Sequence, residues 1–170
     1  GGKSTHLAEL DGDGGELSVE VPARKARLSE QSCARLGHAE AVDVQVADAS
    51  DATALQGLLE SKGWSDGVDA VVVDAPCSGL GTLRRNPEHR YRKADPKAMD
   101  ALSKLQASLL AAAATCVRPG GTLIYSVCSP RYEETDAAVE RFLKEQPSFE
   151  VVAAPLELAP FAAENGAAVR

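Results

Sequence analysis

Several features that mark special classes of protein are scarce in this sequence. Aromatic residues make up only 4% of the chain, so a hydrophobic core must be built mainly from Val, Leu and Ala. No apolar run approaches the roughly 20 residues that a membrane-spanning helix needs. The first five residues lack the apolar stretch of a signal peptide. We therefore expect a cytoplasmic protein that has no membrane partner.

Paired metal ligands are lacking as well. The sequence has four cysteines and three histidines, but no Cys-x-x-Cys pair, and the histidines lie far from the cysteines. Because structural zinc sites usually show paired ligands at short spacing, we expect no metal. In a reducing cytosol the cysteines should be free thiols. Cys33 and Cys116 lie inside helical patterns and are interpreted as small buried hydrophobic residues.

The bulk composition predicts an ordinary globular domain. With 170 residues, 44% of them hydrophobic and 25% charged, we expect one domain that spans residues 1–170. The net charge of −7 argues against a chain that coats nucleic acid non-specifically. Residues 84–97 are an exception, because their six basic and two acidic side chains give them a net charge of +4.

Short strand-like runs alternate with helical patterns along the chain. The predicted strands are 15–21, 42–46, 68–74, 122–126 and 149–153, and the predicted helices are 23–36, 52–62, 97–117 and 133–145. This order predicts a mainly parallel, doubly wound α/β sheet with helices on both faces. In such sheets ligands bind beyond the carboxyl ends of the strands. The residues just after each strand are therefore the candidates for a site.

Acidic residues follow the first two predicted strands. Glu20 lies near the end of residues 15–21, where an acid can accept hydrogen bonds from the ribose hydroxyls of a nucleoside cofactor. Asp48 follows residues 42–46, where a carboxylate or its neighbouring amides can meet an adenine edge. Each acid alone is a weak signal, and Glu20 is equally well explained as an ordinary surface acid.

Two thiols follow the next two predicted strands. Asp74 ends residues 68–74 and is soon followed by Cys77, whereas Cys128 comes just after residues 122–126. Consecutive strands in this topology are often neighbours about 4.8 Å apart. We therefore expect both thiols to project over the same edge of the sheet, which favours a shared chemical function over two unrelated buried cysteines.

The first five residues, Gly-Gly-Lys-Ser-Thr, are similar to the end of a phosphate-binding loop. Such a loop requires an earlier glycine and four spacer residues, which this sequence does not contain. The alternative is a simple turn into a helix, with Ser4 or Thr5 as its cap.

Three longer segments carry a family resemblance: GGKSTHLAEL, VVVDAPCSGLGTLRRNPE and GTLIYSVCSPRYEE. Together they resemble the Sun-type family of RNA 5-methylcytosine methyltransferases, and within it the bacterial members that act on small-subunit ribosomal RNA. The resemblance extends from residue 1 to about residue 152. It implies a Rossmann-like, S-adenosylmethionine-dependent methyltransferase fold, here truncated at both ends and lacking its first and last strands.

The resemblance also implies roles for particular residues. Cys128 matches the nucleophile, Cys77 the second cysteine that assists product release, and Asp74 an acid near the reacting base. The residues that bind S-adenosylmethionine would be Gly1, Gly2 and Lys3 at the end of a cofactor loop, Glu20 at the ribose, Asp48 at the adenine side and Asp74 at the methionine part.

An RNA partner follows from the same resemblance. A base that is methylated must lie in a single strand or be flipped out of a duplex. The basic segment, residues 84–97, begins shortly after Cys77, and basic side chains bind phosphates. We predict that the RNA backbone is held by Arg84, Arg85, Arg90 and Arg92.

Other functions remain as alternatives. A nicotinamide-dependent dehydrogenase should show Gly-x-Gly-x-x-Gly after the first strand, which is absent from this sequence. An amino-group methyltransferase would suit an Asp/Asn-Pro-Pro-aromatic turn, whereas Pro76 is followed here by Cys77, which favours carbon methylation. A non-catalytic RNA-binding or assembly module on the same fold is the last alternative, and the presence of both Cys77 and Cys128 argues against it.

Overall fold

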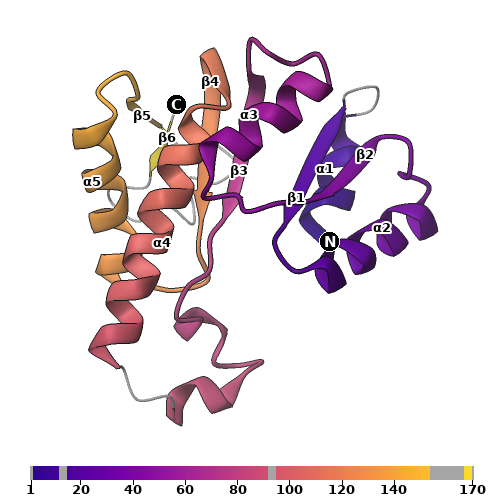
Figure 1. Ribbon diagram of the computed structural model, residues 1–170. Helices are drawn as coiled ribbons and strands as arrows, with labels where there is room; N and C mark the ends of the chain where they lie inside the picture. Colours follow the sequence, from indigo (N-terminus) through magenta and orange to yellow (C-terminus); the bar gives the residue numbers. More distant parts are fainter. Residues whose placement is uncertain (1, 12–14, 92–94, 154–166, 170) are drawn as a thin grey trace. The chain divides into compact units, whose positions relative to one another are not determined.

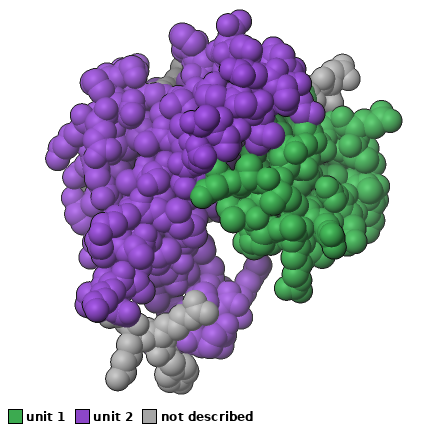
Figure 2. Space-filling model, in the orientation of Figure 1, with its two compact units in different colours: residues 1–49 green, residues 50–170 purple. Residues whose placement is uncertain are grey.

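The chain comprises two compact units. The computed structural model describes residues 2–11, 15–91, 95–153 and 167–169, so the predicted site residues Gly1 and Arg92 lie outside the described residues. Residues 1–49 belong to the first unit and residues 50–170 to the second (Figure 2).

The first unit combines a two-stranded parallel sheet with two helices. Its elements are, in chain order, α1 (Gly2–Asp11), β1 (Glu16–Glu20), α2 (Ala23–Leu36) and β2 (Val42–Val46) (Figure 1). The two strands pair in parallel from Glu16↔Val42 to Glu20↔Val46. The core of the unit is formed by Ala8, Cys33 and Val42, one residue from each of α1, α2 and β2.

Local chemistry sets the ends of the helices in the first unit. Ser4 and Thr5 lie inside α1, where the Thr5 hydroxyl donates to the Gly2 carbonyl at 3.2 Å, so neither residue caps the helix. α2 ends at Leu36 because Gly37 adopts a φ of 84°, a left-handed conformation that glycine takes readily.

The second unit is built on a four-stranded sheet in the order β3-β4-β6-β5. Its helices and strands are α3 (Ala52–Ser61), β3 (Val68–Asp74), α4 (Pro96–Ala114), β4 (Val117–Ser126), α5 (Asp136–Glu145), β5 (Val151–Ala153) and β6 (Ala167–Val169). Three short 3-10 turns complete it: η1 (Leu80–Thr82), η2 (Pro87–Tyr91) and η3 (Tyr132–Glu134). β3 and β4 are parallel, and β6 runs antiparallel to β4 and β5.

Helices α4 and α5 pack together and against the sheet of the second unit (Figure 1). Their contact with the sheet buries Leu110 of α4, Phe142 of α5 and Leu123 of β4. Phe142 also makes an edge-on contact with Phe149, with ring centroids 5.2 Å apart. α4 begins after Asp95, whose side chain accepts a hydrogen bond from the backbone N–H of Lys97 at 3.0 Å.

No helix formed by the described residues has the length and apolar character needed to cross a membrane.

The predicted boundary between α4 and β4 was wrong. The helix predicted for residues 97–117 ends at Ala114, and β4 begins at Val117 instead of residue 122. Residues 119–121, Pro-Gly-Gly, lie within β4 where its register with β3 shifts. Proline donates no backbone hydrogen bond, and Gly120 has a φ of 78°, so the strand bulges here and then continues.

β6 is a strand that the sequence analysis did not predict. It pairs with β4 at Leu123↔Val169 and with β5 from Val151↔Val169 to Ala153↔Ala167. Three residues are too few to show a period, so only their pairing reveals the strand.

Candidate functional site

Two thiols meet beyond the carboxyl ends of β3 and β4. The strands pair in parallel up to Asp74↔Ser126, and both segments then leave the sheet. Cys77 Sγ lies 3.0 Å from Cys128 Sγ. Cys77 is half-buried, whereas Cys128 is exposed. The structure thus brings together the two thiols that follow consecutive strands in the sequence.

The two thiols differ in their surroundings. Burial raises the pKa of the Cys77 thiol, and its hydrogen bond with Cys128 raises this pKa further. Cys77 therefore keeps its proton at neutral pH and can donate it to the sulfur of Cys128. Because Cys128 is exposed, it is the thiol that an incoming substrate can reach.

A buried carboxylate lies beneath the thiols. Glu134 of η3 is only 1% exposed. Its oxygens accept hydrogen bonds from the Ser78 N–H at 2.8 Å, the Ser78 hydroxyl at 2.6 Å and the Ser129 hydroxyl at 2.5 Å. Gln106 Nε2 also donates to the carboxylate, over a longer distance of 3.4 Å. Ser78 and Ser129 directly follow Cys77 and Cys128, so one carboxylate contacts both thiol-bearing segments.

Hydrogen bonding decides the charge of Glu134. Burial alone would raise its pKa, but the hydrogen bonds from Ser129, Ser78 and Gln106 outweigh burial and hold the pKa of Glu134 below its ordinary value. The side chain is therefore an ionised acceptor at neutral pH. Sequence reasoning missed this residue, because nothing in the pair Glu133–Glu134 distinguishes the exposed acid from the buried one.

Glycines let the backbone that follows Cys77 pack closely against its neighbours. Gly81 donates its N–H to the carbonyl of Cys128 at 3.0 Å, and a Cβ on Gly81 would lie 3.0 Å from that oxygen. Gly79 has a φ of 72°, and a Cβ there would lie 2.7 Å from the ring of His89. The segment that follows Cys77 is thus packed tightly against the one that carries Cys128.

The other candidates of the second unit lie around this centre. Asp74 is exposed at the end of β3. Arg84 and Arg85 follow η1, and Arg90 lies in η2; all three are exposed and belong to the segment between β3 and α4. They supply positive charge close in sequence to Cys77. Among the described residues, no group of three or more His, Cys, Asp and Glu side chains is arranged to hold a metal ion.

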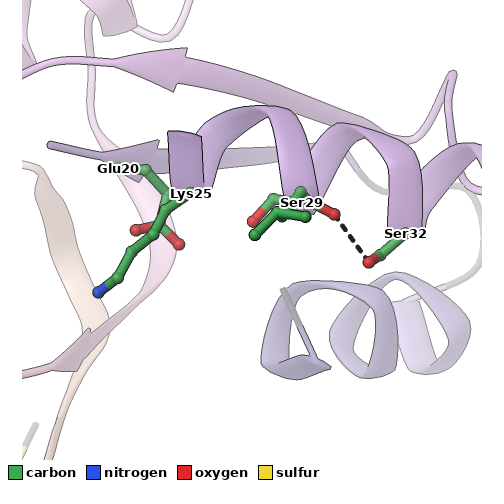
Figure 3. Close-up of a pocket in the computed structure, with 5 residues that line it drawn as sticks. Glu20, Lys25, Ser29 and Ser32 are labelled. Atoms are coloured by element: carbon green, nitrogen blue, oxygen red, sulfur yellow. Dashed lines mark hydrogen bonds between the residues drawn. The ribbon is translucent and has the colours of Figure 1, made fainter. Parts of the chain in front are cut away.

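The first unit holds the other predicted cofactor residues. Glu20 is half-buried at the end of β1 and lines a pocket of about 270 Å³, with the remaining lining residues, Lys25, Leu28, Ser29 and Ser32, on α2 (Figure 3). Asp48 is exposed two residues beyond β2, which is the partner strand of β1. Glu20 and Asp48 therefore lie at the same edge of this small sheet. Gly2 and Lys3 begin α1 and are exposed.

The chain is similar to methyltransferases along most of its length. The family described as 16S rRNA methyltransferase RsmB/F matches residues 1–167. A probable ribosomal RNA small subunit methyltransferase B of Bacillus subtilis is 36% identical over 155 residues, which cover 88% of this chain and 32% of the relative. The ribosomal RNA small subunit methyltransferase B of Xanthomonas campestris is 38% identical, with 85% and 31% covered. This chain spans about a third of the length of these relatives.

Solved structures agree with this relationship. The crystal structure of NSun6 from Pyrococcus horikoshii with SFG has a TM-score of 0.75 and 26% identity, and the match covers 92% of this chain and 37% of that one. The crystal structure of PH0851 has a TM-score of 0.81 and 34% identity, with 92% and 33% covered. The Rossmann-like methyltransferase fold predicted from the sequence is confirmed. This chain belongs to the RsmB/F family of 16S rRNA methyltransferases.

Proposed function

We propose that this chain carries the catalytic centre of an S-adenosylmethionine-dependent RNA methyltransferase, which modifies carbon 5 of cytosine in ribosomal RNA through a covalent adduct with Cys128. The observation that carries the proposal is the 3.0 Å approach of Cys77 Sγ to Cys128 Sγ beyond two adjacent parallel strands. Membership of the RsmB/F family supports methyl transfer to RNA. The relatives named as ribosomal RNA small subunit methyltransferases support the class of substrate.

A thiol overcomes the low reactivity of carbon 5. Addition of the Cys128 thiolate to carbon 6 forms a carbon–sulfur bond and makes carbon 5 electron-rich, so that one difficult step becomes two easier ones. S-adenosylmethionine, when bound, supplies an electrophilic methyl group. After carbon 5 is methylated, it loses its proton, and cleavage of the carbon–sulfur bond returns the thiolate and the aromatic ring.

The surroundings of the two thiols suggest a division of labour. Cys128 is exposed and acts as the nucleophile. Cys77 keeps its proton, because burial and the contact with Cys128 raise its pKa. As a protonated neighbour, Cys77 stabilises the Cys128 thiolate when this leaves the base, and so assists release. Asp74, at the end of β3, would hydrogen-bond the base and stabilise developing charge.

The first unit holds most of the residues that we propose bind the cofactor. The pocket beside Glu20 offers a carboxylate and the Ser29 and Ser32 hydroxyls, which suit ribose hydroxyls. Asp48, at the same sheet edge, would meet the adenine side, and Gly2 and Lys3 would meet the cofactor at the start of α1. The bound SFG of NSun6, an analogue of S-adenosylmethionine, supports this choice of cofactor.

RNA is the proposed partner. The exposed Arg84, Arg85 and Arg90 would bind phosphates of a strand whose target base reaches Cys128. Arg92 belongs to the same proposal on its sequence position alone. The chain as a whole is acidic, with a net charge of −7, so these arginines also direct RNA toward the thiols.

Single cysteine variants test the proposal. Cys128→Ala should abolish methyl transfer and form no adduct, because the nucleophile is lost. Cys77→Ala should trap a covalent protein–RNA adduct, because attack survives while release fails. The measurement is a denaturing gel after incubation of the protein with RNA and S-adenosylmethionine.

Cys116→Ala is the matched control, since Cys116 is a buried thiol at the opposite end of β3 and β4. This variant should behave like the wild type. An adduct with Cys128→Ala but not with Cys77→Ala would reverse the two roles. Absence of any adduct together with unchanged RNA binding would favour a non-catalytic RNA-binding module.

A further inference from the structure

We infer that Glu134 is the positioning residue of the thiol pair: its buried carboxylate joins the segment that carries Cys77 to the segment that carries Cys128 and so fixes their spacing. The inference rests on the proposed function, in which both thiols act on one base. It concerns the geometry of the pair, however, and this geometry can be measured without RNA or cofactor.

The ladder between β3 and β4 does not extend to the thiols, although the Gly81 N–H donates to the Cys128 carbonyl further along. The ladder between β3 and β4 ends at Asp74↔Ser126, with one further bond from the Ala75 N–H to the Ser126 carbonyl at 2.9 Å. Cys77 lies two residues beyond Ala75, and Cys128 lies two residues beyond Ser126. Other contacts must therefore hold the two segments at the spacing that brings the sulfur atoms within 3.0 Å.

Glu134 supplies these contacts at the residue that follows each cysteine. The carboxylate accepts the N–H and the hydroxyl of Ser78 and the hydroxyl of Ser129, and the two hydroxyl oxygens lie 3.0 Å apart. A shift of either serine moves the adjacent cysteine. The carboxylate therefore acts as a clamp on both segments at once.

The clamp is itself fixed on three sides. Glu134 belongs to η3, and its carbonyl accepts a hydrogen bond from the Tyr125 hydroxyl of β4 at 2.9 Å. Gln106 of α4 is fully buried, and its side chain donates to Glu134 and also to the carbonyl of Pro76, at 2.9 Å. The Glu134 backbone is thus held by β4, and its carboxylate by α4.

Replacement variants separate positioning from mere packing. The groups that contact the Glu134 carboxylate are hydrogen-bond donors. An ionised carboxylate can accept all of these hydrogen bonds, since it has no proton of its own to place. Glu134→Gln keeps one acceptor oxygen and a similar volume, so it should retain part of the clamp. Glu134→Ala retains none of it. Glu133→Gln is the matched control, because Glu133 is the exposed neighbour whose carboxylate contacts Arg131.

The first experiment measures the effective concentration of the two thiols toward each other in a glutathione redox buffer. Oxidised glutathione accepts two electrons: a disulfide forms between Cys77 and Cys128, the glutathione disulfide breaks, and two reduced glutathione molecules take up the two thiol protons. Peptide mapping by mass spectrometry identifies the bond. Glu134→Ala should lower the effective concentration at least tenfold, Glu134→Gln should lower it less, and Glu133→Gln should leave it unchanged.

Circular dichroism shows whether each variant is folded. Should Glu134→Ala fail to fold, Ser129→Ala replaces it, because this variant removes the clamp on one segment only and should give an intermediate loss. An effective concentration equal to that of the wild type, in whichever of these two variants is folded, would overturn the inference.

The second experiment links the clamp to the reaction. With RNA and S-adenosylmethionine, Glu134→Gln should lower kcat while the KM for S-adenosylmethionine stays unchanged, because only the covalent step depends on the thiol spacing. An unchanged kcat in a variant with loosened thiols would show that the clamp has no part in the reaction. If Cys77→Ala forms no adduct with RNA, the proposed function is wrong, whereas the glutathione measurement on the wild type and the Glu134 variants still decides the positioning of the thiols.

Discussion

The two ends of the β3–β4 pair are held in different ways. Where β3 begins, the backbones come so close that a Cβ on Gly67 would lie 2.8 Å from Arg118 N, and one on Gly121 would lie 2.9 Å from Asp69 O. The polar contact there is an exposed ion pair between Arg118 and Asp69. Where β3 ends, buried polar side chains surround a carboxylate beneath two thiols. The first end is thus held mainly by backbone fit, whereas the second adds a buried network of side-chain hydrogen bonds to the backbone contact between Gly81 and Cys128.

This difference separates stability from chemistry. Close backbone packing does not remove any charged side chain from water. It therefore stabilises the sheet without a desolvation cost. A buried carboxylate loses its hydration and contributes favourably only when its hydrogen bonds are all in place. Such an arrangement is sensitive to geometry, and for that reason it suits a place where two thiols must be kept at a fixed spacing.

The largest expected effect tests the backbone-packed end. Gly67→Ala should lower the free energy of unfolding by about 2–4 kcal/mol, because the left-handed conformation costs an L-residue about 1–2 kcal/mol and the new methyl group overlaps the backbone. The φ of Gly67 is 89°. Urea denaturation measures the change.

Gly63→Ala is the matched control for that substitution. Gly63 has a φ of 75°, but a Cβ there would meet nothing within 4 Å. The free energy of unfolding of this variant should fall only by the cost of the left-handed conformation, about 1–2 kcal/mol. Equal losses for the two variants would mean that backbone overlap does not hold this end together.

A smaller effect concerns the acid sensitivity of the thiol-bearing end. The pKa of Glu134 is lower in the folded protein than its ordinary value of 4.5, so its ionised form adds stability that is fully present above pH 4.5. This stability is lost as the pH falls through the lower, folded pKa. The wild type should therefore lose stability below pH 4.5 more steeply than Glu134→Gln, as followed by urea denaturation at several pH values.

Glu145→Gln serves as the control for this comparison, because Glu145 is an exposed acid at the end of α5. Its stability should follow the pH dependence of the wild type. Parallel curves for the wild type and Glu134→Gln would show that the buried carboxylate adds no acid-sensitive stability.

The smallest expected effect belongs to the exposed ion pair. The side chains of Arg118 and Asp69 are 54% and 83% exposed. Exposed pairs contribute about 0.2–1 kcal/mol and are screened by salt. A double-mutant cycle with Arg118→Ala and Asp69→Ala should give a coupling energy within that range, and one well above it would mean that charge also helps to hold this end.

Hydrophobic pattern alone predicted much of the sheet. α2, β2 and β3 have the bounds that the sequence indicated, because their apolar periods are regular and their ends are marked by Gly37 or by a change to polar residues. The start of β4 was missed because Pro119 and Gly120 usually mark a turn, and here they form a bulge inside a strand. β6 depends on pairing with segments far away in the sequence, which no local pattern reveals.

The candidate site divides in the same way. Cys77 and Cys128 were identified from the sequence because parallel topology brings the ends of consecutive strands together. Glu134 was not identified, because its burial depends on Ser78 and Gln106, which are 56 and 28 residues away along the chain. The end of a strand can be predicted from the neighbouring residues. The burial of the Glu134 carboxylate, by contrast, depends on contacts between segments that lie far apart in the sequence.

The contact between Gly81 and the Cys128 carbonyl also limits how this part of the chain can vary in length. Gly81 must reach that carbonyl, and Gly79 must lie under the ring of His89, so the count of residues from Cys77 to Arg84 sets where the first arginine stands relative to the thiols. An insertion between Gly79 and Gly81 would displace the arginines even if every side chain were kept. Spacing in the sequence therefore sets the distance between the arginines that we propose bind RNA and the sulfur that we propose attacks its base.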